Sequence, residues 1–160
     1  FVKYACEELK PMGVFVSGDV FGTIINSNAD GEAIGQSYVE LSRYLDYICP
    51  MIYPSHYGFG YAGIQYPDKE PAKIIKMALN SSNKRIADIP DYQHKAICRP
   101  WLQDFTASYL GSKNGVERYL VYDAEVLRIQ MEATYESGLT DWLLWNAGGY
   151  YTEDAWLPDE

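Results

Sequence analysis

Short apolar runs alternate with longer amphipathic stretches along this chain. Four of the runs are bounded by Gly, Pro or Asp, which predicts β-strands at residues 14–19, 46–53, 97–102 and 141–145. A stretch with helical character precedes each strand, at residues 2–10, 37–45, 70–80 and 126–137. Gly138 stands where a left-handed cap would end the last helix. The predicted order is therefore a helix followed by a strand, repeated four times.

This repeated order predicts a parallel sheet. One helix between successive strands matches the βα repeat of a (β/α)8 TIM barrel, which needs about 250 residues. The 160 residues supply only four units, and the first helix has no strand before it. We therefore expect an α/β fold, the C-terminal half of a TIM barrel of about four βα units, with residues 1–160 as a single domain that is a fragment of a larger barrel. The alternative is a complete, open, doubly wound sheet, which the length alone favours.

Composition narrows the class of ligand. The chain is 48% hydrophobic and 22% charged, as in ordinary globular domains. A net charge of −9 argues against nucleic acid and anionic membranes as partners, because both would be repelled at long range. Aromatic residues make up 15% of the chain, and flat rings suit the apolar faces of sugars. For most of the fifteen tyrosines, however, packing of helices on a sheet is the better explanation.

The cysteines and histidines show no metal-binding spacing. Cys49 and Cys98 lie within predicted strands, where free cysteine behaves as a small buried hydrophobic residue. His56 and His94 are not spaced as a ligand pair. We therefore predict neither a metal nor a cofactor.

The first predicted strand carries a candidate catalytic residue. Phe15, Ser17 and Asp19 share one face of this strand because side chains alternate. A hydroxyl and a carboxylate should face the polar mouth of the barrel, since apolar helices seal the outer face. Asp19 is then a candidate catalytic carboxylate near the strand end. The alternative is that Asp19 caps the turn that follows.

The third predicted strand places Arg99, Trp101 and Gln103 on one face. Arg99 should point toward a carboxylate inside the barrel, either to bind substrate or as a structural ion pair. Trp101 is suited to stack on a sugar ring, and Gln103 to hydrogen-bond its hydroxyls. Asp104 has the opposite parity, and it is the reserve second carboxylate if the chain has already entered a loop.

The other two strands end in polar and aromatic residues as well. Pro54 and Gly58 predict a tight turn after the second strand, and two glycines after the fourth allow close approach of a ligand. Asp46 and Asp141 lie at strand starts, where a contribution to stability is the better interpretation. These strand ends add five candidate substrate-binding residues: Tyr53, His56, Tyr57, Trp145 and Asn146.

Four segments resemble a known family: SGDVFG, DYICPMIYPSHYG, RPWLQDF and WLLWNAGGYYT. They are similar to the C-terminal half of the glycoside hydrolase-like TIM-barrel domain of bacterial cell-envelope proteins, a family of otherwise unknown function. The resemblance covers nearly the whole chain. It implies a carbohydrate substrate, O-glycosyl hydrolase activity in the full-length parent, and a location outside the cell or at the cell envelope. Asp19 matches the Asp of the family's strand-end motif, with Gly18 where Ala is usual.

The same resemblance implies a second strand-end Asp that would lie before Phe1. Glycoside hydrolysis usually needs two carboxyl groups, so our hypothesis gives Asp19 one role and this upstream Asp the other, with Arg99 adjusting their protonation. We expect the 160 residues alone to be inactive. A non-catalytic carbohydrate-binding barrel is the alternative. Half a barrel exposes two sheet edges, which favours a homodimer as well as pairing with the missing N-terminal half.

Overall fold

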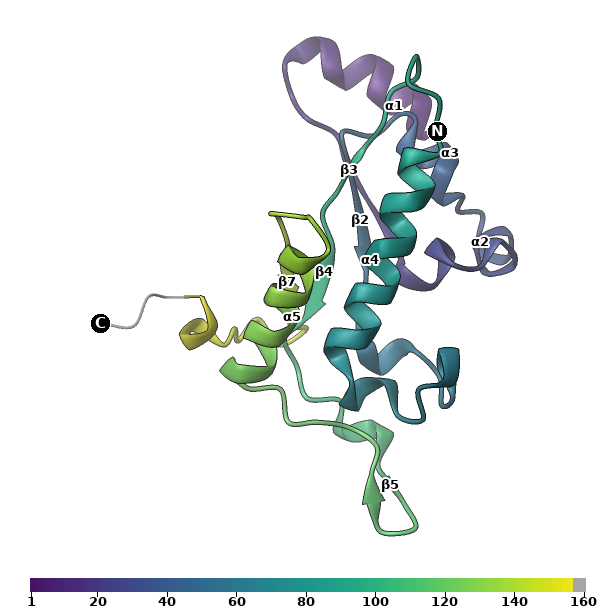
Figure 1. Cartoon of the computed structure of the whole chain (residues 1–160). Helices are drawn as coiled ribbons and strands as arrows, with labels where there is room; N and C mark the ends of the chain where they lie inside the picture. The colour runs from purple at the N-terminus through teal and green to yellow at the C-terminus, as the bar shows by residue number, and fades with distance from the viewer. Residues whose placement is uncertain (157–160) are drawn as a thin grey trace. The chain divides into compact units, whose positions relative to one another are not determined.

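The computed structural model describes residues 1–156 (Figure 1). These residues divide into two compact units. The first unit is formed by Phe1–Met51 and Ala78–Pro100. The second is formed by Ile52–Met77 and the described part of Trp101–Glu160. Helix α4 (Pro71–Ala87) contributes residues to both.

Three parallel strands form the sheet of the first unit: β1 (Ser17–Phe21), β2 (Tyr47–Met51) and β3 (Ile97–Cys98). Ser17 pairs with Tyr47, and Tyr47 pairs in turn with Ile97. Parallel neighbours need long crossover connections, and helices lie both between β1 and β2 and between β2 and β3.

The helices of the first unit are α1 (Val2–Leu9), α2 (Asn28–Ile34), α3 (Tyr38–Ser42) and the C-terminal part of α4. Serine side chains begin α2 and α3, because Ser27 and Ser37 each accept a hydrogen bond from a backbone N–H three residues on. Helix α2 was not predicted from the sequence.

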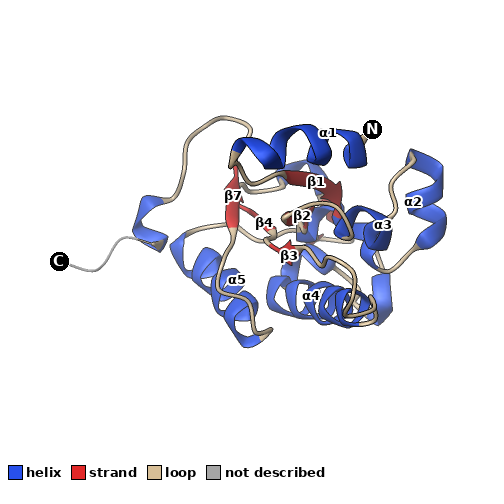
Figure 2. Ribbon diagram, turned by 90° about the horizontal axis from the view of Figure 1, so that it is seen from above, coloured by secondary structure: helices blue, strands red, loops and turns tan. Residues whose placement is uncertain are grey.

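The core of the first unit lies between the strands and α4, which runs beside them in both views (Figures 1 and 2). Val20, Ile48 and Leu79 are almost completely buried. The Tyr38 hydroxyl lies 2.7 Å from Ser82 Oγ and donates to Cys98 Sγ at 3.6 Å. Burial raises the pKa of Tyr38 well above its usual value, so its hydroxyl stays neutral.

The second unit contains the parallel pair β4 (Trp101–Gln103) and β7 (Leu143–Trp145), with α5 (Ala124–Glu136) beside them (Figure 2). Gln130 of α5 bonds the backbone of Gln103 twice: its Oε1 accepts from the N–H at 3.1 Å, and its Nε2 donates to the carbonyl at 2.9 Å. Asp123 caps the start of α5, and Gly138 follows its end with φ +82°. The predicted left-handed cap is thus confirmed.

A short hairpin also belongs to the second unit, formed by β5 (Ser112–Lys113) and β6 (Val116–Glu117). Its turn has positive φ at both Asn114 and Gly115. Asn-Gly is the preferred pair for such a turn, so the sequence contained a signal for this hairpin that the strand prediction did not use.

The predicted α/β class is confirmed, with parallel strands and flanking helices. The described strands do not close into a barrel. The predicted strand 97–102 is wrong in detail, because it divides into β3 and β4 around Pro100, which has no N–H to donate to a neighbouring strand. The first strand begins at Ser17 rather than at residue 14, and α4 continues to Ala87, beyond the predicted end at residue 80.

Among the described residues, no helix combines the length and the apolar character needed to cross a membrane.

Asp46, just before β2, ties two other segments of the first unit to the sheet. Its carboxylate accepts a hydrogen bond from the Val16 N–H at 2.8 Å and pairs with Lys10 Nζ at 2.8 Å. Burial alone would raise the pKa of Asp46, but these bonds outweigh it and lower the pKa.

We predict that Asp46→Asn destabilises the protein by about 1–3 kcal/mol at pH 7, the usual range for a lost charged hydrogen bond. Because folding lowers the pKa of Asp46, its contribution is complete above the unfolded value near about 4 and is lost as the pH falls further. Urea unfolding of both proteins from pH 7 down to pH 3 measures this. The difference should shrink on acidification, whereas exposed Asp88→Asn should show little difference at any pH; a constant difference for Asp46→Asn would contradict the assignment.

Candidate functional site

Asp19, Cys49 and Arg99 lie side by side on neighbouring strands of the first unit. The register of β1 and β2 pairs Asp19 with Cys49. The Arg99 N–H donates to the carbonyl of Ile48 at 3.0 Å, directly after the paired residues Ile48 and Cys98, so Arg99 follows next to Cys49. We call these three residues the charged row.

The charges of Asp19 and Arg99 both affect the pKa of the Cys49 thiol. The pKa of Cys49 is raised to about 11, chiefly by burial; the negative charge of Asp19 contributes to the rise, and the positive charge of Arg99 opposes it. Cys49 is 1% exposed. It is therefore a protonated thiol at neutral pH, and a nucleophilic role for it is disfavoured.

Side chains of β1 alternate between solvent and core. Ser17, Asp19 and Phe21 are exposed, whereas Val20 is 1% exposed. The carboxylate of Asp19 thus lies on the face opposite the apolar core. This is the face that the alternation in the sequence predicts for it.

An aromatic side chain supports Arg99. The guanidinium carbon lies 3.7 Å from the centre of the Tyr47 ring, a cation–π contact, and Phe15 packs edge-on against Tyr47 at 6.0 Å. Sequence analysis missed Tyr47, although its spacing of two residues from Cys49 places both on the same face of the strand.

A second group of candidate residues belongs to the other unit. Tyr53 is buried, and its ring packs edge-on against His56 at 5.1 Å and Phe105 at 5.9 Å. His56 is exposed. Partial burial lowers the pKa of His56, so its imidazole is neutral at pH 7. The group offers hydrogen bonding and an aromatic surface rather than a charge.

Trp101 and Trp145 come together on the paired strands β4 and β7. Their ring centres are 6.0 Å apart, with planes nearly perpendicular at 88°. Trp145 is 43% exposed and Trp101 is partly exposed. Such a pair provides an apolar surface with indole N–H donors, which suits a sugar ring.

Tyr57, also a predicted substrate-binding residue, is 5% exposed and packs against Tyr61 with ring centres 4.9 Å apart. Within the described residues its buried hydroxyl has no hydrogen-bond partner. Burial raises its pKa. The geometry therefore favours a packing role for Tyr57, against Tyr61, over contact with a substrate.

Gln103 is completely buried, and its amide is fully used by the protein. Its Oε1 accepts from the Ser55 N–H at 3.1 Å and the Ser55 hydroxyl at 2.8 Å. Its Nε2 donates to Asp68 Oδ1 and to the Phe105 carbonyl, both at 3.0 Å. The expectation that Gln103 binds sugar hydroxyls therefore gives way to a structural role, because no donor or acceptor of its amide is left over.

Asp68 is a buried carboxylate that sequence analysis missed. It is 1% exposed, and its Oδ2 accepts from the Leu120 N–H at 3.0 Å. Burial raises the pKa of Asp68, while the hydrogen bonds from Gln103 and Leu120 oppose the rise. An aspartate in a Pro-Asp loop carries no sequence signal for this role, because its partners come from distant segments.

Asp104 is also engaged within the protein. It is 2% exposed, and its two carboxylate oxygens accept from the N–H of Thr152 at 2.9 Å and from the hydroxyl of Thr152 at 2.7 Å. Asn146 donates to the Asp104 carbonyl at 2.5 Å and accepts from the Gly148 N–H at 2.8 Å. Both side chains thus hold the segment after β7. This geometry speaks against the expected role of Asp104 as a second catalytic carboxylate and of Asn146 as a sugar ligand.

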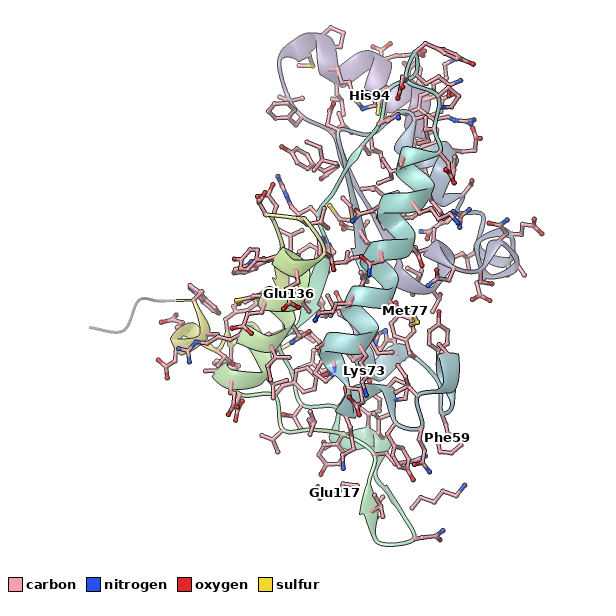
Figure 3. All side chains as sticks on the ribbon, viewed as in Figure 1. Phe59, Lys73, Met77, His94, Glu117 and Glu136 are labelled. Carbon is pink, nitrogen blue, oxygen red and sulfur yellow. The ribbon has the colours of Figure 1, made fainter. Side chains whose placement is uncertain are left out.

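No group of three or more His, Cys, Asp or Glu side chains that suits a metal ion occurs in residues 1–156. An open pocket of about 410 Å³ lies near the start of β2, with Cys6, Lys10, Arg43 and His94 among its lining residues (Figure 3 labels His94). Lys10 pairs with Asp46 and Arg43 with Glu40. The charges around this pocket are thus already balanced, and Asp19 does not line it.

Comparison with known proteins identifies the family. Residues 1–151 match the model of a family described as a putative glycosyl hydrolase domain, and the chain belongs to that family. The resemblance noted in the sequence is thereby confirmed. A search of the curated proteins finds no match.

We predict that Tyr57→Phe stabilises the protein by about 1 kcal/mol, because it removes a buried hydroxyl that lacks a partner. Tyr38→Phe is the matched control: it deletes a hydroxyl bonded to Ser82 and should destabilise by a similar amount. Denaturant unfolding of the two variants measures both changes. Equal destabilisation by the two substitutions would show that the Tyr57 hydroxyl has a partner.

Proposed function

We propose that this chain is part of a glycoside hydrolase that cleaves a polysaccharide or oligosaccharide, with Asp19 as one of its two catalytic carboxylates. Membership of a glycosyl hydrolase domain family supports the class of reaction. The observation that carries the assignment of Asp19 is the charged row, in which an exposed carboxylate lies one strand from a buried thiol and two strands from a guanidinium.

Two carboxyl groups normally flank the scissile bond, about 5 Å apart for retention and about 6.5–9.5 Å apart for inversion. Asp19 supplies one of them, as acid, base or nucleophile. Asp68 and Asp104 are buried and engaged by protein donors, which disfavours both as its partner. In this proposal the second carboxylate comes from chain outside residues 1–160, as the family pattern implies.

Arg99 serves as a substrate-binding residue beside Asp19. Its guanidinium has five N–H donors and suits hydroxyl or carboxylate oxygens of a sugar. The contact with the Tyr47 ring limits the orientations that this long side chain adopts. Tyr47 is thus a positioning residue for Arg99.

In the second unit, Trp101 and Trp145 stack on sugar rings, and neutral His56 hydrogen-bonds a hydroxyl, with Tyr53 fixing the imidazole. A location at the cell envelope is part of the proposal and rests on the family resemblance. Pairing as a homodimer and with an N-terminal half-barrel also stay predictions.

Asp19→Asn should lower the rate of hydrolysis by about 100-fold or more, because acid–base catalysis usually contributes at least that much. The measurement is mass-spectrometric detection of oligosaccharides released from bacterial-wall and plant polysaccharides by the full-length protein and by its variant. Asp88→Asn, at an exposed position in the same unit, is the control and should retain the wild-type rate.

An undiminished rate for Asp19→Asn would contradict the assignment of Asp19. Failure of the wild-type protein to release products from polysaccharides that it binds would contradict hydrolysis altogether. That second result would favour a carbohydrate-binding module.

A further inference from the structure

We propose that an aromatic ledge in the second unit binds an acidic polysaccharide chain. The ledge consists of Phe59, Tyr61 and Tyr66 on the loop that follows β2, together with Lys113 of β5. It contains none of the residues assigned to catalysis or substrate binding above. The inference rests on the proposed function for the carbohydrate nature of its ligand.

The ledge contains an exposed aromatic ring, that of Phe59, which packs against a neighbouring tyrosine. Phe59 is 64% exposed and lies at the outer edge of its loop (Figure 3). Tyr66 packs edge-on against Phe59 at 5.5 Å, and Tyr61 packs against buried Tyr57 at 4.9 Å. A large exposed ring that is held by its neighbours is ready to cover the apolar face of a pyranose.

The backbone of this loop is fixed by its own hydrogen bonds. The N–H groups of Tyr61, Gly63 and Ile64 donate to carbonyls three residues before them, at 3.0, 3.0 and 2.9 Å. Ala62 adopts φ +51°, a left-handed conformation that costs a non-glycine residue about 1 kcal/mol or more. A loop held in one conformation loses little entropy when a ligand binds, which favours recognition.

Charge selects the kind of polysaccharide. The Lys113 ammonium lies over the Phe59 ring, 5.6 Å from its centre, so a sugar that packs on the exposed part of this ring meets a cation. The net charge of −9 repels a polyanion at long range, so any preference for one must come from this contact with Lys113, which a neutral glycan would not exploit. A uronic acid fits both features, because its ring face packs on Phe59 while its carboxylate pairs with Lys113.

Affinity electrophoresis of the full chain tests this, in native gels that contain entrapped polygalacturonate or its methyl-esterified form. The two polymers share a backbone and differ in carboxylate charge. We expect retardation by polygalacturonate, with a Kd at least about tenfold lower than for the ester. Phe59→Ala should weaken binding of polygalacturonate about tenfold or more, and Lys113→Gln should abolish the preference for the charged polymer.

Matched controls come from the other unit. Tyr92 is 87% exposed, so Tyr92→Ala tests the loss of any exposed aromatic ring, and Lys3→Gln tests the loss of any exposed ammonium. Both should bind as the wild-type protein does. Phe59→Tyr should retain binding, and circular dichroism shows whether each variant is folded.

Wild-type binding by folded Phe59→Ala, or equal affinity for the two polymers, would overturn the inference. The binding and hydrolysis assays test the ledge and the proposed hydrolase activity independently. If hydrolysis depends on Asp19 but Phe59→Ala does not change binding, only the proposal that the ledge binds polysaccharide is contradicted. Binding that depends on Phe59 and Lys113, with no hydrolysis of any polysaccharide, would support the ledge and remove only the catalytic proposal.

Discussion

The parallel register of β1, β2 and β3 is the constraint on which the candidate site depends. Asp19 and Cys49 are register partners, and Arg99 follows on the third strand. Because side chains alternate along a strand, a slip of one residue would turn Asp19 toward the core and Val20 toward solvent. Burial of Val20 holds the register in place, since an apolar side chain that leaves the core costs about 1.5–3 kcal/mol. Burial of Val20 on one face of β1 thus determines that Asp19 lies on the other face.

Burial also separates the aspartates of this chain into different roles. Asp19 is exposed, whereas Asp68 and Asp104 are buried and each bonded to donors from distant segments. A buried carboxylate is tolerated only when hydrogen bonds replace its water. Asp68 and Asp104 therefore organise the loops of the second unit, whereas Asp19 is the exposed one of the three.

Sequence reasoning predicted the parts of this arrangement that depend on local pattern. The four apolar runs, the face of Asp19 and the cap at Gly138 follow from alternation, periodicity and glycine conformation. The role of Gln103 did not follow, because its partners Ser55 and Asp68 are 48 and 35 residues away in the chain. The same holds for Asp104, whose bonds to Thr152 span 48 residues. Parity places a side chain on a face, but only tertiary contacts decide whether a ligand can still reach it.

The reactivity of Cys49 measures the charged row most directly. Peptide-level mass spectrometry follows the rate at which iodoacetamide alkylates Cys49 near pH 8.5, with the buried Cys98 in the same digest as reference. The account predicts a rate above wild type in Asp19→Asn, because removal of the negative charge lowers the pKa of the thiol, and a rate below wild type in Arg99→Gln. Opposite changes in the two variants exclude simple loosening of the fold, which would raise both rates. Equal rates in the wild-type protein and both variants would contradict the row.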